Sequence, residues 1–497
     1  MVNVDKENQR FSNAQDRDIS SHYLKLGLKS GLEIHQQLDV GKLFCSCPGV
    51  LRSDKPDFVV KRKLHRVAGE LGEVDIAVEY EAAMGKEFEY QGYDDSTCLV
   101  ELDDEPPHLI NERALDEALK IALLLNCEIY PVVQVMRKTV IDGSNTSGFQ
   151  RTVLIGYDGY VETSFGRVFI ESIALEEDAA RIIKRGKRRV VYRLDRLGIP
   201  LVEVATGPVM NNPEQIKEVA LKIGEILRAC RVKRGIGTIR QDVNVSIKGH
   251  DRVEIKGFQD PTMMVKTVDF EVERQQKDLK NGKTEGDVRN ALPDGRTEFL
   301  RPIPGGARMY PETDLPLLKI SRERVNGLKR KLPKLRGEIK DELRKKGVSE
   351  ELINLVVYEI DEFESLLKVY DKDANLVAKM ITLWRSDLAA KFDTGIDEVR
   401  EKVGESVLER ILEALKKGKI DKGDVQGIME KVMRGEDVGE ALKVEKVSDD
   451  EVEEEVRKVV KGKPGLRPNA YMGLVMAKFK GKIDARRAME IIKKIIS

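Results

Sequence analysis

The chain is poor in cysteine, with five cysteines in 497 residues. So few cysteines exclude the disulfide framework of a small secreted protein, and reduced thiols fit the cytosol. Long hydrophobic runs are also absent, since no stretch approaches the roughly 18 consecutive apolar residues that a membrane-spanning helix requires. The first 23 residues are polar and contain no apolar signal-peptide core. These absences predict a cytoplasmic protein with no membrane partner.

Net charge is the next thing the chain lacks. Lys and Arg number 86, and so do Asp and Glu, so the formal net charge is zero. No global field attracts a polyanion, and any nucleic-acid binding must depend on local charge. Basic residues do gather at the C-terminus, where residues 461–497 hold ten basic and two acidic residues, a net charge of +8. Six acidic residues within 449–455 precede this basic segment.

The common nucleotide-binding motifs are missing as well. Gly282, Lys283 and Thr284 imitate the end of a phosphate-binding P-loop, but Lys277 stands where that motif requires glycine. No G-x-G-x-x-G motif lies between a predicted strand and a predicted helix. The sequence therefore disfavours a P-loop or dinucleotide-binding fold.

Two patterns divide the chain into parts. From about residue 28 to 314, short alternating runs separated by Gly, Asp and Asn predict strands and hairpins, with helices near 114–126 and 213–230. From about residue 321 to 442, apolar residues recur every three or four positions and predict successive helices. We therefore expect an α+β multidomain protein with a mixed, largely antiparallel first domain. Its predicted parts are a polar extension (1–25), the mixed domain (26–318), an all-helical domain (319–442) and a small helical tail (443–497).

A candidate metal site lies within the mixed domain. His35 and Glu33 share one face of a predicted strand, and carboxylates recur at Glu176, Glu177, Asp178 and Glu203. One imidazole with several carboxylates suits Mg²⁺ or Mn²⁺ better than structural zinc. Spacing alone also fits an ordinary hydrogen-bonded histidine and solvated carboxylates at strand ends.

Two further motifs have plainer interpretations. Cys45 and Cys47 form a C-x-C pair with Cys98 far downstream, and without a second pair the pattern favours unliganded thiols over zinc. The run KRGKRR at 184–189 has the charge to contact phosphates, although such a run is more typical of a charged turn between strands.

Six segments occur in an order that carries a family resemblance. They are GLEIHQQLDVGKLF, MRKTVIDGSNTSGFQR, ALEEDAAR, LDRLGIPLVEVAT, VEIKG and RMYPETDLP. Together they resemble the B/E family of subunits of the tRNA-dependent amidotransferases over about residues 26–496. CLVELDDEPPH and RKLHRVAGELGEVD look like the archaeal E branch more than the bacterial B branch.

The resemblance implies an architecture and one departure from it. The family has a cradle-like catalytic domain, a helical domain and a basic tail domain similar to YqeY proteins. The archaeal branch also carries an inserted domain similar to one in bacterial aspartyl-tRNA synthetases, between a helix ending near Leu279 and the segment GRTEFLRP. Here only residues 280–294 bridge that position, so we expect the insert to be missing.

The resemblance also implies an activity, which is ATP-dependent conversion of Glu-tRNA(Gln) to Gln-tRNA(Gln). The γ-carboxylate is phosphorylated and ammonia then displaces phosphate, with Mg²⁺ neutralising phosphate charge. Matching the family motifs assigns catalysis to Glu33, His35, Glu176, Glu177 and Glu203, and the metal to the last four. Which of Glu176 and Glu177 is the ligand stays open, because adjacent strand residues face opposite ways. Glu33, Gln37 and Asp178 are candidates for supporting roles or additional ligands.

Phosphate and tRNA contacts are predicted from the same resemblance. The loop after residue 140 can cradle phosphate with its backbone N–H groups and hydroxyls, and Arg151 and Arg240 are candidate charge clamps. The expected loop residues are Gly143, Ser144, Asn145, Thr146, Ser147 and Gly148. The expected tRNA-binding residues are Arg467, Lys478, Lys480, Lys482, Arg486 and Arg487.

The chain lacks the Ser-Ser-Lys or Thr/Lys apparatus of an amidase or asparaginase, so ammonia must come from a partner. The resemblance makes that partner an asparaginase-like archaeal D subunit, in a heterotetramer of two D and two E subunits. Two alternatives stay open: a bacterial-type B subunit that also serves Asp-tRNA(Asn), and a non-catalytic tRNA-binding scaffold.

Overall fold

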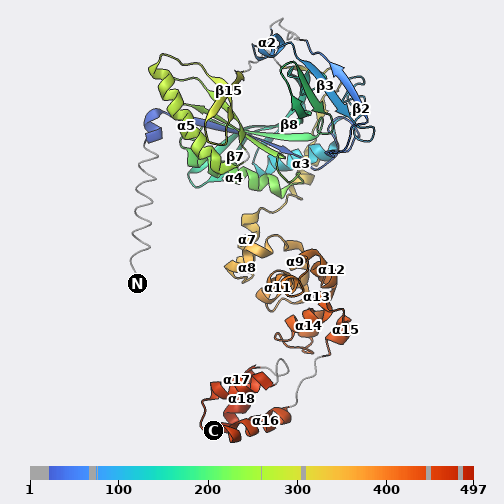
Figure 1. Cartoon of the computed structure of the whole chain (residues 1–497), viewed down its shortest axis with the longest axis vertical. Helices are drawn as coiled ribbons and strands as arrows, with labels where there is room; N and C mark the ends of the chain where they lie inside the picture. The colour runs from blue at the N-terminus through green and yellow to red at the C-terminus, as the bar shows by residue number, and fades with distance from the viewer. Residues whose placement is uncertain are drawn as a thin grey trace. The chain divides into compact units, whose positions relative to one another are not determined.

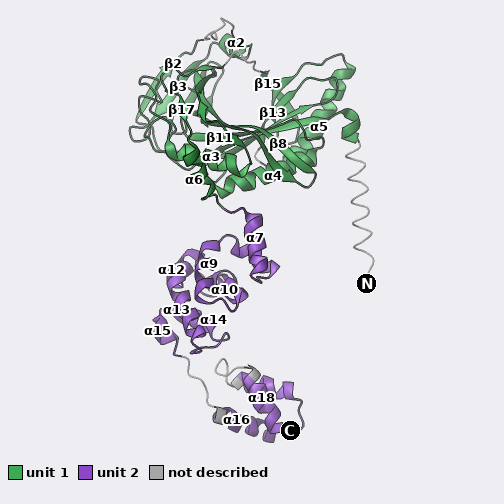
Figure 2. Ribbon diagram, turned by 180° about the vertical axis from the view of Figure 1, so that it is seen from behind, with its two compact units in different colours: residues 1–333 green, residues 334–497 purple. Residues whose placement is uncertain are grey.

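The computed structural model describes residues 22–65, 74, 76–258, 260–303, 309–443, 449–478 and 485–496. The chain forms two compact units, Met1–Pro333 and Lys334–Ser497, which Figure 2 colours separately. Unit 1 combines sheets with helices, and the described part of unit 2 is helical. The predicted α+β class is confirmed, with a large mixed sheet followed by a helical C-terminal region.

An eleven-stranded sheet forms the centre of unit 1. In spatial order its main path is β15 (Thr297–Pro302), β14 (Asp287–Ala291), β13 (Val253–Phe258), β12 (Ile239–Ser246), β1 (Lys29–Gln37), β11 (Pro200–Thr206), β8 (Gly166–Glu177), β7 (Phe149–Thr163), β6 (Val135–Thr139) and β16 (Met309–Pro311). The short β4 (Glu128–Ile129) pairs with β7. All described pairings in this sheet are antiparallel except β13 with β14, so the sheet is mixed but largely antiparallel.

Two smaller sheets complete the strands of unit 1. A four-stranded sheet has the order β2 (Phe58–Arg62), β3 (Glu87–Gly92), β10 (Arg189–Arg193) and β9 (Arg181–Arg185). A two-stranded sheet pairs β17 (Leu318–Lys319) with β5 (Val132–Val133). The four-stranded sheet has its own apolar cluster, which includes Tyr90, Val190 and Tyr192.

Three helices of unit 1 cover one face of the large sheet, and the other face carries polar side chains. Besides the helical residues 22–26, the helices of unit 1 are α2 (Ile76–Ala83), α3 (Glu112–Leu124), α4 (Pro213–Ala229), α5 (Pro261–Lys280) and α6 (Arg322–Lys329). Among them, α4 packs against β1 and β7, and α5 packs beside α4 and against β12 (Figure 1). Along β1, Leu32 and Ile34 are fully buried and alternate with the partly exposed Glu33 and His35. The alternation therefore sends Glu33 and His35 to the face away from the helices.

The two helices predicted near 114–126 and 213–230 are confirmed as α3 and α4. α4 begins where Asn212 accepts a hydrogen bond from the Gln215 backbone N–H and Pro213 fixes the first helical φ angle. Its buried residues recur every three or four positions, as in Ile216, Val219 and Ile223. This spacing places one apolar stripe against the sheet.

A short connection between α5 and β14 occupies the position at which the inserted domain was expected. α5 ends at Lys280, and β14 begins at Asp287 and extends the large sheet. Within the connection, the Lys283 N–H donates to the Asp278 carbonyl at 2.9 Å and the Asp251 N–H donates to the Thr284 carbonyl at 2.8 Å. Part of the segment 280–294 is thus a strand rather than a plain linker.

Unit 2 consists of helices throughout its described residues. They are α7 (Arg336–Lys345), α8 (Glu350–Val356), α9 (Ile360–Val369), α10 (Ala374–Ile381), α11 (Leu383–Lys391), α12 (Ile396–Lys402), α13 (Glu405–Lys416), α14 (Val425–Met433), α15 (Val438–Ala441), α16 (Asp449–Gly462), α17 (Pro468–Lys478) and α18 (Ala485–Ile496). α7 to α15 share one apolar core, and α16 to α18 form a separate cluster around Val456, Tyr471 and Ile492. None of the described helices is long and apolar enough to cross a membrane.

The helical unit begins later than the sequence predicts. β17 and α6 fall within the predicted helical domain 319–442 or at its edge, yet they belong to unit 1. Arg324 of α6 explains this placement, since its guanidinium donates to Asp116 of α3 at 2.8 Å. The division between the units lies after Pro333.

A buried ion pair in unit 2 gives a stability prediction. Arg385 is only 2% exposed and donates to both Glu362 carboxylate oxygens, at 2.6 and 2.7 Å, and to the Val403 carbonyl. Arg385→Ala leaves Glu362 without its cation, and breaking such a pair costs about 3–5 kcal/mol. Thermal or denaturant unfolding of unit 2 measures the loss. Arg344→Ala is the control, because exposed pairs contribute little and Arg344 bonds Asp341 and Glu350 on the surface.

Candidate active site

The register of three strands builds the site. β1 lies between β11 and β12, and His35 faces Glu203 on one side and Arg240 on the other. The His35 Nε2 atom and a Glu203 carboxylate oxygen are 3.1 Å apart. Glu176 reaches the same place from β8, the strand on the far side of β11. One ligand atom from each of His35, Glu176 and Glu203 lies within 4.8 Å of the other two, so the three can share one cation.

A lysine that sequence patterns did not single out lies among these carboxylates. The Lys138 Nζ atom is 2.5 Å from a Glu176 oxygen and 3.9 Å from a Glu203 oxygen. Lys138 comes from β6 and belongs to the segment MRKTVIDG, within one of the family motifs. The site thus already accommodates a positive charge between Glu176 and Glu203.

Glu176 and Glu177 lie on opposite faces of β8, and only Glu176 lies in the His35 group. Glu177 points to the opposite face of β8, where its carboxylate accepts from the Arg151 backbone N–H at 3.3 Å and faces the Arg151 guanidinium. Glu177 is therefore not part of the His35 group. Arg151 is also misassigned as a phosphate clamp, because it is 4% exposed and bonds Glu177 and Glu312 away from the site.

Electrostatics couple His35 to Glu203. Burial alone would lower the pKa of His35, but the hydrogen bond to Glu203 and the charges of Asp242 and Glu176 raise it above its ordinary value. Burial alone would raise the pKa of Glu203, but His35 and Lys138 hold that pKa well below its usual range. The charged forms of the two residues thus stabilise each other. A divalent ion binds the neutral imidazole of His35, so it competes with the proton whose binding Glu203 favours.

A second carboxylate group adjoins the first on the same face. Glu33 lies opposite Asp242 on β12, and Glu254 on β13 completes a set whose oxygens lie within 4.8 Å of one another. The Lys256 ammonium contacts both Asp242 and Glu254. Burial, followed by the nearby Glu203 and Glu254, raises the pKa of Glu33. Glu33 thus lies in the group beside the His35 site, and its predicted role as a supporting or additional ligand stays a prediction.

A cavity of about 430 Å³ opens over the site and is lined by residues that include His35 and Glu176. This volume falls in the usual range for small-molecule pockets, about 300–1,000 Å³. Its cationic lining residues are Lys138, Arg240, Lys256 and Arg301. Arg240 is held in place by Asp178, whose carboxylate it contacts at 2.8 Å and which also accepts from Gln37 at 2.6 Å. Arg240 thus borders the cavity with Asp178 and Gln37 behind it, and the predicted roles of these three residues stay predictions.

The predicted phosphate loop has a different role in the structure. Asp142 lines the cavity, but the residues from Gly143 to Gly148 do not. Asn145 and Thr146 are buried, and the Thr146 hydroxyl donates to the Glu101 carbonyl at 2.5 Å. Ser144 and Ser147 bond within the loop, to Asn145 and to the Phe149 carbonyl. The side chains of the loop thus stabilise the loop and its neighbours instead of facing the cavity.

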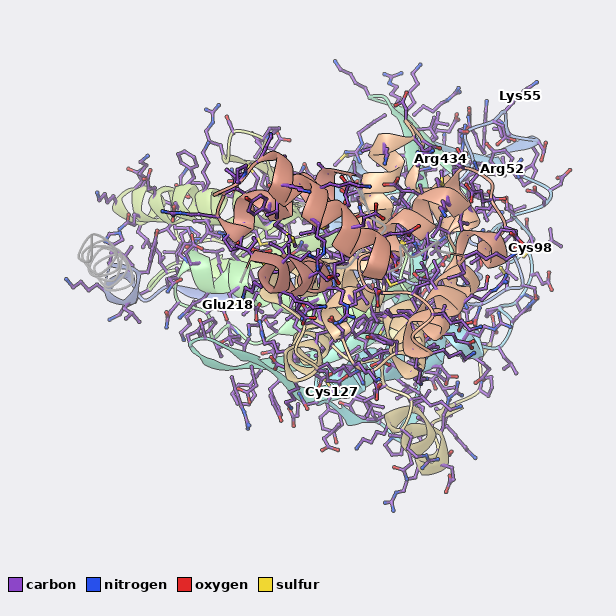
Figure 3. All side chains as sticks on the ribbon, turned by 90° about the horizontal axis from the view of Figure 1, so that it is seen from below. Arg52, Lys55, Cys98, Cys127, Glu218 and Arg434 are labelled. Carbon is purple, nitrogen blue, oxygen red and sulfur yellow. The ribbon has the colours of Figure 1, made fainter. Side chains whose placement is uncertain are left out.

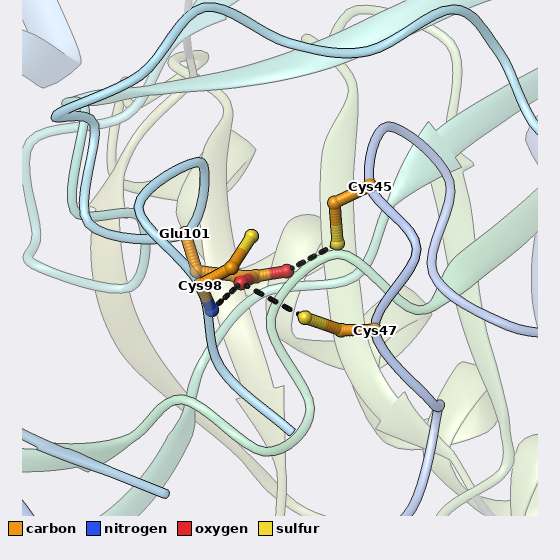
Figure 4. Close-up of side chains that lie close together, drawn as sticks. All are labelled: Cys45, Cys47, Cys98 and Glu101. Carbon is orange, nitrogen blue, oxygen red and sulfur yellow. Dashed lines mark hydrogen bonds between the residues drawn. The ribbon is translucent and has the colours of Figure 1, made fainter. Parts of the chain in front are cut away.

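Three cysteines and a carboxylate meet at a separate place in unit 1 (Figure 4). One ligand atom from each of Cys45, Cys47, Cys98 and Glu101 lies within 4.8 Å of the others. The Cys45 thiol donates to Glu101 at 2.8 Å, and the Cys98 backbone N–H donates to the same carboxylate at 2.6 Å. The buried Lys42 ammonium, 3.2 Å from Glu101, compensates the charge.

The thiol cluster has the donors of a tetrahedral zinc site. The neighbouring Cys45 thiol lowers the pKa of Cys47 to about 7, although burial acts in the opposite direction. A lowered thiol pKa favours the thiolate, which is the form that binds a metal. The sequence pattern favoured unliganded thiols because it contains no second cysteine pair. The fold supplies Cys98 and Glu101 in place of that pair, whereas Cys127 lies well apart from Cys98 (Figure 3).

The predicted tRNA-binding residues of the tail are described only in part. Arg467 and Arg487 are exposed. The side chains of Lys478 and Arg486, and Lys480 and Lys482 altogether, lie outside the described residues. Their role in tRNA binding stays a prediction.

A cavity lined by both cationic and acidic side chains thus lies over the histidine–carboxylate group on the large mixed sheet. Residues 28–326 match the family model described as the GatB/GatE catalytic domain. The chain belongs to this family of amidotransferase subunits.

Curated relatives extend the similarity over nearly the whole chain. The E subunit of the glutamyl-tRNA(Gln) amidotransferase of Methanocaldococcus jannaschii is 37% identical over 630 aligned positions, which cover 95% of this chain and 99% of the relative. The protein of the same name from Methanothermobacter thermautotrophicus is 34% identical, covering 90% of this chain and 94% of the relative. That from Pyrobaculum neutrophilum is 33% identical, covering 96% and 99%.

The alignment length bears on the expected missing insert. An alignment of 630 positions is longer than the 497 residues of this chain, so the Methanocaldococcus relative contains many residues without a counterpart here. The short connection between α5 and β14 is consistent with that difference.

We expect the purified protein to contain about one tightly bound zinc ion, because three sulfur atoms and one carboxylate match its preferred ligands. Elemental analysis after removal of loosely bound metal measures it. Cys98→Ser is expected to lose most of this zinc, whereas Cys127→Ser, which changes a cysteine outside the cluster, is expected to retain it. Equal zinc contents in the two variants would contradict the assignment.

Proposed function

We propose that this chain is the catalytic subunit of an amidotransferase that converts glutamate attached to tRNA(Gln) into glutamine at the expense of ATP. The observation that carries the proposal is the coincidence of two features. The cavity over His35, Glu176 and Glu203 lies inside the matched catalytic domain, and relatives named for Glu-tRNA(Gln) align with at least 90% of the chain.

The proposed reaction has two steps. A carboxylate is a poor electrophile, because its leaving group would be an oxide ion. One oxygen of the γ-carboxylate therefore attacks the γ-phosphorus of ATP, ADP leaves, and an acyl phosphate forms. Ammonia then adds to the carbonyl carbon, the carbon–oxygen bond to phosphate breaks, and a proton of the former ammonia passes to the solvent. The products are the amide, ADP and inorganic phosphate.

The cavity has the residues that such a phosphoryl transfer requires. His35, Glu176 and Glu203 would hold Mg²⁺, or Mn²⁺, and the fit is supported by the positive charge that Lys138 already places between the two carboxylates. The ion supplies charge neutralisation for the transferring phosphoryl group. Arg240 and Arg301 border the cavity and suit the binding of phosphate oxygens. Because Asp178 holds Arg240 in place, its guanidinium needs little reorganisation in the reaction.

The relatives' names as E subunits indicate a multi-subunit enzyme that acts with tRNA. We place an asparaginase-like D subunit as the source of ammonia, in an assembly of two D and two E subunits. The alternative of a bacterial-type B subunit is disfavoured, since these relatives are named as E subunits. The intact His35 group argues against a non-catalytic scaffold.

Glu203→Gln, which removes one charged ligand, and His35→Ala are each expected to lower the rate of ADP formation by about 10²–10⁴. The measurement is ADP release with Glu-tRNA(Gln), ATP and Mg²⁺, with a thermal melt to verify folding. Glu171→Gln changes an exposed carboxylate on the same strand as Glu176 and serves as the matched control. Near-normal ADP formation by a folded Glu203→Gln variant would reject the metal assignment.

Ammonium salts are expected to replace the partner subunit. The chain alone should form ADP and, with free ammonium, Gln-tRNA(Gln), but it should make no product from asparagine or glutamine. Chromatography of the amino acid released from the tRNA measures this. Direct use of an amide donor by the single chain would be the contrary result. The same assay with Asp-tRNA(Asn) separates the E-type from the B-type activity, and an E-type protein should leave aspartate unchanged.

A further inference from the structure

The β9–β10 hairpin is the most basic element in the described part of unit 1. Residues 181–193 hold seven basic residues and no acidic residue, within a chain of zero net charge. β9 and β10 pair antiparallel, and a turn stabilised by the Gly186 N–H donating to the Arg189 carbonyl joins them. β9 is an edge strand of the four-stranded sheet, on the other side of β10 from β3.

The basic residues of the hairpin fall into two sets. Three of them are used within the fold: Arg181 pairs with Asp195, Arg189 with Glu87, and Arg193 with the Gln91 side chain. The other four lie around the turn and are exposed, and the described structure gives them no ion pair: Lys184, Arg185, Lys187 and Arg188. Four adjacent cations without carboxylate partners repel one another, so the fold itself does not account for them.

Protection of an open sheet edge explains only part of this charge. Edge strands often carry a lysine that prevents pairing with another chain. Two of the four cations, however, lie in the turn, where there is no strand edge to protect. The exposed Ile182 and Ile183 show in addition that β9 is not polar throughout. The concentration of charge at the tip therefore points to a polyanion.

The base of the hairpin is fixed to the rim of the active-site cavity. Ala179 and Asp142 line the cavity. The Ala180 N–H donates to the Ser144 carbonyl at 2.8 Å, and the Tyr192 hydroxyl donates to the Asp142 carbonyl at 2.9 Å. Gly186 is seven positions after Ala179 in the sequence. The tip therefore lies at most about 25 Å from the cavity wall. The loop 143–148, rather than binding phosphate directly, thus supports the hairpin.

We infer that the tip of the β9–β10 hairpin binds the sugar–phosphate backbone of the tRNA acceptor stem and directs the aminoacylated end into the cavity. The inference rests on the proposed function, which requires the esterified glutamate to reach His35 and Glu203. The single-stranded end of the tRNA would then extend from the cavity to its rim. The double-stranded acceptor stem would begin just outside the rim, within reach of the hairpin tip. Such contacts position an RNA without reading its sequence.

The test neutralises the tip and a matched site. One variant changes Lys184, Arg185, Lys187 and Arg188 to Gln. The control changes Lys248, Lys277, Lys280 and Lys283, four exposed lysines near the C-terminal end of α5, on the opposite side of unit 1 from β2 and β3 (Figure 1). Both variants lose four positive charges. The probes are full-length tRNA(Gln) and an acceptor-stem minihelix, titrated into the full chain at several salt concentrations.

The tip variant is expected to bind both RNAs more weakly and with a flatter salt dependence. Each lost phosphate contact removes about 0.7–0.9 from the slope of log K against log salt. Its KM for Glu-tRNA(Gln) in ADP formation should rise, and kcat at saturating tRNA should stay near the parent value. The control variant should match the parent chain in both measurements.

Several outcomes would overturn the inference. One is unchanged minihelix binding by the tip variant. Another is an equal loss of RNA affinity in the tip variant and the control variant, which would indicate non-specific electrostatic attraction. Unchanged RNA binding combined with weaker association with the partner subunit would assign the tip to an acidic protein surface. Absence of tRNA-dependent ADP formation in the parent chain would instead refute the proposed function, and the minihelix titration would still report on the hairpin.

Discussion

The antiparallel register of β11, β1 and β12 is the constraint on which the site depends. It places His35 between Glu203 and Arg240, and Glu33 opposite Asp242. Because side chains alternate along a strand, a shift of one residue would send His35 to the face covered by helices. Leu32 and Ile34, both fully buried, oppose that shift, since it would expose them on the polar face. The apolar residues of β1 thus fix the register in which its polar residues can act together.

Many carboxylates lie close together at the site, and nearby cations compensate their charge. Two groups of acids adjoin one another on one sheet face, and each has an ammonium among its oxygens, Lys138 in one and Lys256 in the other. The opposite face of β8 follows the same rule, since Glu177 and Glu312 share Arg151. Each cation compensates part of this negative charge, and carboxylate oxygens are the ligands that a divalent ion prefers.

Local patterns predicted the strands, the helices and several residues of the site, but not their long-range partners. The sequence predicted that Glu33 and His35 share one face of a strand, and it predicted the helices α3 and α4 near their observed positions. The choice of Glu176 over Glu177 needed the pairing of β8, and the meeting of Cys98 with Cys45 needed the path of a distant loop. Arg151 was misassigned because the sequence near a glycine-containing loop does not show whether an arginine faces a cavity or a buried carboxylate. Short motifs report residue types, whereas ion pairs depend on tertiary contacts.

The pairing of β1 has a consequence for synthesis of the chain. His35 and Glu203 are separated by 168 residues, so the central strand is made long before either neighbour exists. At about 5–20 residues per second, β1 waits roughly 10–30 s on the ribosome before β11 follows it. During that time its apolar residues have no native partner, and contacts so distant in sequence form slowly. The nascent first unit is therefore a natural client for chaperones that shield unpaired strands during translation.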